Sequence, residues 1–94
     1  MSEEQAITAE ILRQVEARGE GKSICPSEVA RSLAPEAWRP LMSAVRRAAI
    51  KLSQANQIDI LRKGHVVQAG EIRGVIRLRV HSPVPVIDEP QESG

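Results

Sequence analysis

The stretch that most constrains this chain covers residues 38–57, where apolar and polar side chains alternate with a helical period. The apolar members recur three or four positions apart, at Leu41, Val45, Ala48 and Leu52. At about 100° per residue, another group falls on the opposite side, at Ser43, Arg46, Arg47, Ile50 and Gln54. The pattern predicts one long amphipathic helix that faces the core along one side and solvent along the other.

Residues 4–18 predict a first helix that supports the long one. Its apolar face consists of Ile7, Ile11, Leu12 and Val15. Gly19 follows directly, and glycine is common where a helix ends. Because the outer face of this helix is acidic, we do not expect it to contact phosphates.

A second, shorter helix is predicted to begin at Pro26, because proline suits the first turn of a helix. Ile24 and Cys25 precede it as a short extended segment that enters the edge of a sheet. Pro35 prevents the helix from continuing, since it lacks a backbone N–H. Trp38 comes next, and we expect its large side chain to pack over the junction with the long helix.

Two strands are predicted after the long helix. Residues 58–63 place Ile58 and Ile60 inward, and residues 75–80 alternate apolar side chains with Arg77 and Arg79. Residues 64–74 contain three glycines and form the candidate wing between these strands. The fold class is therefore mainly α with a small β-hairpin (α+β). We predict a winged helix-turn-helix of three helices and a two- or three-stranded antiparallel sheet.

Charge divides the chain into three parts. Residues 1–20 carry two arginines and five glutamates, a net charge of −3. Residues 21–82 carry eleven Lys or Arg and four acids, a net charge of +7. The final residues, 83–94, add three acids and are rich in proline. We expect one winged-helix domain over residues 1–81, a disordered acidic tail over residues 82–94, and an anionic partner for the basic middle.

Several function classes are disfavoured. The lone Cys25 has neither a disulfide partner nor a zinc-ligand set, and we expect it to be a small buried residue. With two isolated histidines and no glycine-rich fingerprint, we expect no enzyme activity, cofactor or metal. One Trp and no Phe or Tyr argue against stacking on single strands. Without a signal peptide or membrane-spanning stretch, we expect a cytoplasmic protein.

Four motifs together resemble a known family. They are Ile24-Cys25-Pro26-Ser27-Glu28-Val29-Ala30-Arg31, then Trp38-Arg39 with Leu41-Met42 and Val45-Arg46, then Arg62-Lys63-Gly64, then Arg73-Gly74 with Ile76-Arg77-Leu78-Arg79. The family comprises small, mostly bacterial proteins catalogued as a domain of unknown function with winged-helix character. The resemblance spans nearly all of residues 5–80. It implies a winged-helix fold and brings no established activity, so it assigns no binding residue.

The leading functional hypothesis is that the chain binds duplex DNA as a transcriptional regulator, with the long helix in the major groove. Four side chains would face the groove: Arg39, Ser43, Arg46 and Arg47. Lys51 and Lys22 would meet phosphates, and the wing would reach the adjacent backbone through Lys63, His65 and Arg73. A monomer of this size would bind weakly, so useful specificity needs a dimer or larger assembly, although the oligomeric state is left open.

The alternative is a protein-interaction module that does not bind DNA. Ile50 lies in the middle of the predicted outer face, where an exposed apolar residue suits a protein partner or a second copy of the chain as well as a thymine methyl group. The net charge of +1 is also low for a lone DNA-binding domain.

Overall fold

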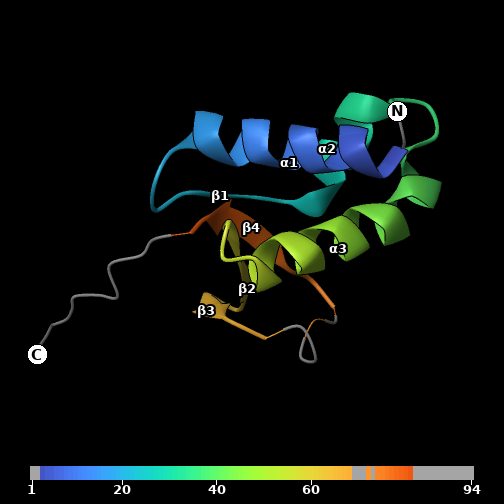
Figure 1. The fold of residues 1–94 in the computed structure, drawn as a ribbon. Helices are drawn as coiled ribbons and strands as arrows, with labels where there is room; N and C mark the ends of the chain where they lie inside the picture. Colours follow the sequence, from blue (N-terminus) through green and yellow to red (C-terminus); the bar gives the residue numbers. More distant parts are fainter. Residues whose placement is uncertain (1–2, 69–71, 73, 82–94) are drawn as a thin grey trace, which may run out of the picture.

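The computed structural model describes residues 3–68, 72 and 74–81, and has three helices and a small antiparallel sheet (Figure 1). In chain order the elements are α1 (Glu3–Arg18), β1 (Ser23–Ile24), α2 (Pro26–Leu33), α3 (Trp38–Gln54), β2 (Ile58–Arg62), β3 (His65–Val66) and β4 (Arg77–Val80). This order confirms the winged helix-turn-helix fold. The predicted acidic tail and Arg73 lie outside the described residues.

The sheet has the strand order β1-β4-β2-β3, and all of its pairs are antiparallel. It thus has four strands where two or three were predicted. The additional strand is β3, which follows a turn at Lys63 and Gly64, both with positive φ (55° and 84°). Two such residues make a type I′ turn, whose twist brings the chain straight back along β2. A strand of two residues is too short to produce a periodic sequence pattern.

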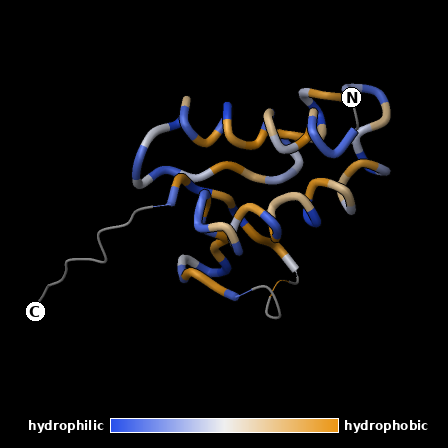
Figure 2. The backbone as a smooth tube through the Cα atoms, in the orientation of Figure 1, coloured by the Kyte–Doolittle hydropathy of each residue, from blue (hydrophilic) through white to orange (hydrophobic). Residues whose placement is uncertain are grey.

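The core is aliphatic and lies between the helices and one face of the sheet. The helices contribute Ile7, Ile11, Val15, Val29, Ala30, Val45, Ala48, Ala49 and Leu52. The sheet contributes Ile24, Ile58, Ile60, Ile76 and Leu78. Along α1 and α3, Figure 2 shows apolar stretches alternating with polar ones, as expected for helices with one buried side. The predicted inward residues of α1 and of the sheet are therefore confirmed, except that Leu12 and Val80 are only half-buried at the margin of the core.

Local backbone chemistry explains where α1 and α3 end. α1 ends at Arg18, and the following Gly19 has a φ of 97° and donates its N–H to the carbonyl of Val15 at 3.1 Å. α3 ends at Gln54, three residues before the predicted limit. Asn56 there adopts a φ of 61°, a left-handed conformation that asparagine tolerates better than most residues. The chain can therefore turn from α3 into β2 within a few residues.

Among the described residues, no helix has both the length and the apolar character needed to cross a bilayer.

Candidate nucleic-acid interface

The solvent-facing side of α3 carries most of the residues predicted to read DNA. Arg39, Ser43 and Arg47 are exposed, and Arg46 is half-buried. Arg39 and Arg46 are seven positions apart, so their side chains leave the helix in nearly the same direction. These two arginines form a row along one side of α3, and Ser43 lies between them in sequence.

Ile50 corrects one sequence-based expectation. It is half-buried and packs against the hydrophobic core, so it does not form the exposed apolar centre that was predicted. Val67 and Ile72, which lie between β3 and β4, pack against the same core. Helical periodicity places Ile50 away from the core, but it takes no account of chain segments that return beside the helix.

A side-chain hydrogen bond fastens the segment before β4 to α3. Nη2 of Arg46 donates to the carbonyl oxygen of Gly74 at 2.6 Å. Gly74 has a φ of 69°, and the next residue, Val75, is 82% exposed. The end of the wing therefore lies beside the arginine row of α3 and presents an apolar side chain to solvent.

Trp38 lies at the corner between α2 and α3, with two arginines over its ring. The guanidinium carbon of Arg31 is 4.3 Å from the ring centroid, and that of Arg39 is 4.6 Å away. Each cation–π contact contributes about 0.5–1 kcal/mol at an exposed site. The predicted packing of Trp38 at this corner is confirmed, because its half-buried ring also contacts the core. Arg31 is a member of this surface that sequence reasoning missed.

Lys51 was predicted to meet phosphates but instead forms an ion pair with Glu4 of α1. This hydrogen bond lowers the pKa of the Glu4 carboxyl below its ordinary value, and the charge of Arg47 adds to the effect. The acidic first turn of α1 therefore lies against the side of α3 that carries Arg47 and Lys51. It partly neutralises Lys51 and Arg47, whereas Arg39 and Arg46 leave α3 in a different direction.

The remaining predicted cations do not share one surface. Lys22 precedes β1 at one edge of the sheet, whereas Lys63 and His65 lie at the other edge, beyond β4 and β2. The strand register also places Ser23 level with Asp59, near the beginning of β2, whereas Lys63 follows its end. Lys22 therefore does not join the wing, while Lys63 and His65 are exposed beside it.

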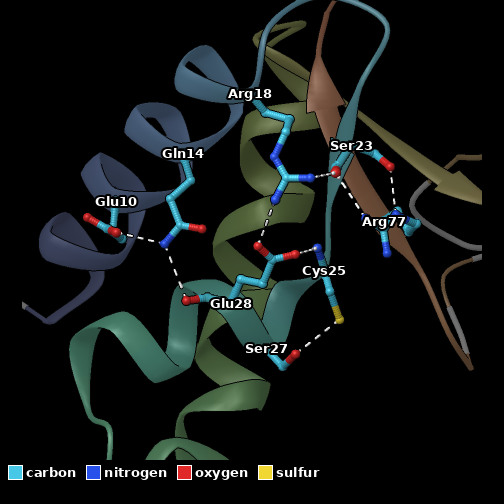
Figure 3. Close-up of polar contacts among 8 residues, drawn as sticks. All are labelled: Glu10, Gln14, Arg18, Ser23, Cys25, Ser27, Glu28 and Arg77. Atoms are coloured by element: carbon cyan, nitrogen blue, oxygen red, sulfur yellow. Dashed lines mark hydrogen bonds and ion pairs between the residues drawn. The ribbon is translucent and has the colours of Figure 1, made fainter.

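The first family motif is explained by a polar network around β1 (Figure 3). Glu28 accepts a hydrogen bond from the Cys25 backbone N–H at 2.9 Å and pairs with Arg18 at 3.0 Å. Arg77 donates to the hydroxyl and to the carbonyl oxygen of Ser23, at 2.6 and 2.9 Å. These contacts cap α2 and attach β1 to β4, so Arg18 and Arg77 have structural roles.

The predicted role of Cys25 as a small buried residue is only partly met. Its side chain is half-buried, and its Sγ accepts a hydrogen bond from the Ser27 hydroxyl at 3.1 Å. Cys25 is also the residue that caps α2. Cys25 therefore belongs to the motif as the residue at which α2 begins.

A second cluster was missed because both histidines were treated as isolated. Asp59 is only 9% exposed, and it accepts a hydrogen bond from Arg79 at 3.1 Å. Its other oxygen lies 2.8 Å from Nδ1 of His81. Asp59 and Arg79 lie on the two predicted strands, and pairing these strands in the register that the structure shows places the two residues side by side. That pairing could have revealed the cluster. Since both carboxylate oxygens have partners, the arrangement ties β2 to the end of β4.

Within residues 3–68, 72 and 74–81, no group of three or more His, Cys, Asp or Glu side chains could hold a metal ion. A groove of about 580 Å³ opens where the beginning of α1 faces the α2–α3 corner. Its lining is mostly apolar, and it also includes Ser43, Arg47 and Glu3. Ser43 and Arg47, which were predicted to face the DNA groove, thus border this groove between α3 and α1.

No curated protein matches this chain. The family described as "Protein of unknown function (DUF3253)" matches residues 4–81, which contain nearly all of α1 and every other helix and strand described above. The match extends to the wing and the arginine row of α3. The chain therefore belongs to the DUF3253 family of proteins of unknown function.

Proposed function

We propose that this protein binds duplex DNA as a winged helix-turn-helix, with α3 in the major groove and the wing on the adjacent backbone. An α-helix fits the major groove, and the 17 residues of α3 give it a length of about 25 Å. The residues assigned to the groove are Arg39, Ser43, Arg46 and Arg47. Lys63 and His65 are assigned to the backbone, while Lys51 and Lys22 are withdrawn from the interface.

One observation carries this proposal, namely the distribution of ion pairs. In the part of the chain that the structure describes, carboxylates pair with Arg13, Arg18, Lys51 and Arg79. No ion pair there involves the four arginines of α2 and α3: Arg31, Arg39, Arg46 and Arg47. Their other contacts, with the ring of Trp38 and the carbonyl oxygen of Gly74, leave their positive charges without a carboxylate partner, which supports an external anion.

Phosphate neutralisation would supply most of the affinity and make it strongly dependent on salt. Base contacts from the outer side of α3 would add specificity. Such a protein would act in the cytoplasm as a non-catalytic regulator of transcription. This role follows from the proposed activity and is proposed along with it.

Fluorescence anisotropy with a labelled random duplex tests the proposal. We expect micromolar protein to bind at low salt and to be released as salt rises. The variant carrying Arg46→Gln and Arg47→Gln should lose about tenfold or more in affinity, because two phosphate or base contacts disappear. A control carrying Arg13→Gln and Arg18→Gln removes the same charge from α1, where both cations already pair with carboxylates, and should bind nearly as well as the original protein.

Absence of binding at low salt would overturn the proposal and favour the protein-interaction alternative. That alternative was centred on Ile50, which the half-buried position of this residue no longer supports. Equal losses in the two double variants would show that binding depends on net charge alone, and would contradict the assignment to α3.

A further inference from the structure

We infer that Arg31 and Arg39, aligned by the ring of Trp38, clamp one backbone phosphate of the DNA. This inference rests on the proposed function, and it adds a phosphate contact at the edge of the groove, where Arg39 begins the arginine row of α3. Arg31 belongs to the last turn of α2 and Arg39 to the first turn of α3. The clamp therefore joins the two helices of the helix-turn-helix, which lie next to each other in Figure 1.

Both arginines contact the same neutral ring. Their guanidinium carbons lie 4.3 and 4.6 Å from the centroid of Trp38, so they are less than about 9 Å apart, and both residues are exposed. Contacts with the ring face restrict where each guanidinium can lie. Two positive charges at this separation repel each other, so an anion between them would relieve the repulsion and find two donor groups restricted by the same ring.

The acid nearest to this corner in the sequence is Glu36, which lies in the turn before α3 and forms no ion pair with either arginine. The first turn of α3 has no acidic residue, and its N-cap, Ala37, makes no side-chain hydrogen bond. Within the described residues, neither Arg31 nor Arg39 forms an ion pair. The positive end of the helix dipole at this corner adds to the attraction for an anion.

The position of the corner indicates that the anion is a DNA phosphate. In helix-turn-helix proteins the beginning of the recognition helix enters the major groove, while the preceding helix crosses the backbone. Trp38 is the first residue of α3, so a guanidinium on the last turn of α2 would face the wall of the groove. Guanidinium groups match phosphate oxygens through paired hydrogen bonds, which a lysine cannot reproduce.

The test measures how DNA affinity depends on salt in the full chain. Arg31→Gln and Arg39→Gln are compared with Arg13→Gln. This control also removes one positive charge, but from an arginine of α1 that already pairs with Glu10. Each clamp variant should bind a random duplex about threefold to tenfold more weakly. The slope of log Kobs against log salt should become shallower by about 0.9, which corresponds to one lost phosphate contact. Arg13→Gln should leave the slope unchanged.

Trp38 supplies an independent readout, because it is the only tryptophan and the chain has no tyrosine or phenylalanine. Adding the duplex should change its intrinsic fluorescence, with the same midpoint as the anisotropy titration. Arg31→Lys keeps the charge but loses the planar donor group, so it should fall between the original protein and Arg31→Gln.

The outcomes of these titrations distinguish failure of the clamp from failure of the proposed function. If the original protein binds DNA but both clamp variants keep its slope, the clamp is overturned and the proposed function remains. If the original protein does not bind DNA at low salt, both ideas fail together. A shallower slope in the clamp variants, with the control unaffected, supports the clamp.

Discussion

The guanidinium of Arg46 lies 2.6 Å from the backbone oxygen of Gly74 and so connects the middle of α3 to the wing. The two residues are 28 positions apart, and the hydrogen bond between them is part of what holds the wing beside α3. Because Arg46 is also one of the proposed groove-facing residues, its side chain has two possible partners. Free protein would use it to fasten the wing, and bound protein would share it with DNA.

Replacing Arg46 by alanine should therefore loosen the wing before any DNA is added. We expect the free energy of unfolding to fall by about 0.5–1.5 kcal/mol, the usual contribution of one such hydrogen bond. Urea denaturation measures the loss, and amide exchange should accelerate at Val75 and Ile76. Arg47→Ala is the matched control, because it removes a neighbouring arginine that makes no contact with Gly74. Equal effects of the two substitutions would contradict the role of Arg46.

Replacing Glu4 by glutamine should strengthen DNA binding at low salt by about twofold to fivefold. Glu4 pairs with Lys51 and lies close enough to Arg47 for the arginine charge to lower its pKa. Removing this carboxylate leaves more positive potential on α3, which attracts phosphates more strongly. Anisotropy titration provides the measurement.

The control for this prediction is Glu16→Gln, which changes the net charge equally. Glu16 is an exposed residue of α1, and its carboxylate forms no ion pair within the described ranges. A gain that is as large in the control would mean that overall charge, and not the neighbourhood of α3, sets the affinity.

Glu28 should stabilise the fold without contributing to binding. Its carboxylate accepts the Cys25 N–H and pairs with Arg18, so alanine would remove a helix cap and an ion pair at once. We expect Glu28→Ala to lower the free energy of unfolding by about 1–2 kcal/mol in urea denaturation. Glu28→Gln keeps an acceptor for the Cys25 N–H, so its loss should be smaller. A glutamine variant as unstable as the alanine variant would argue against the capping role.

Glu10 should make stability depend on pH in the acidic range. Its hydrogen bond from Arg13, helped by Gln14 and Ser32, lowers the pKa of the carboxyl from 4.5 to about 2. The stabilisation is therefore complete above pH 4.5 and is lost as the pH falls toward 2. After allowance for solvent screening, we expect a loss of roughly 1–2 kcal/mol.

Urea denaturation between pH 2.5 and 6 measures this dependence. Glu10→Gln should be less stable than the original protein at pH 6, and its stability should change less as the pH falls. Glu16→Gln should retain the full dependence. Parallel curves for the original protein and Glu10→Gln would place the origin of the acid sensitivity elsewhere.

Most of the fold could be predicted because its signals are local. Pro26 and Gly19 identify helix boundaries through their backbone preferences, and the alternation around Leu78 identifies a strand through side-chain direction. The strand β3 was not predicted because only one of the two residues in the turn before it, Gly64, is typical of such a turn. Lys63 adopts a positive φ of 55°, which its residue type does not suggest.

The site was less predictable because its contacts join residues far apart in the chain. Lys51 and Glu4 are separated by 47 positions, and Asp59 and His81 by 22. Helical periodicity states which way Lys51 points but not which element lies there. Arg31 was overlooked for the same reason, since its position over Trp38 depends on the angle at which α2 meets α3.

The two outermost strands of the sheet, β1 and β3, contain two residues each. A long strand at a sheet edge exposes a row of N–H and C=O groups that can recruit a strand from another molecule and begin aggregation. Edges of this length offer few such groups, so joining the sheets of two copies gains few hydrogen bonds. Any contact between two copies is therefore expected to use side-chain surfaces, and the protein should resist edge-to-edge aggregation.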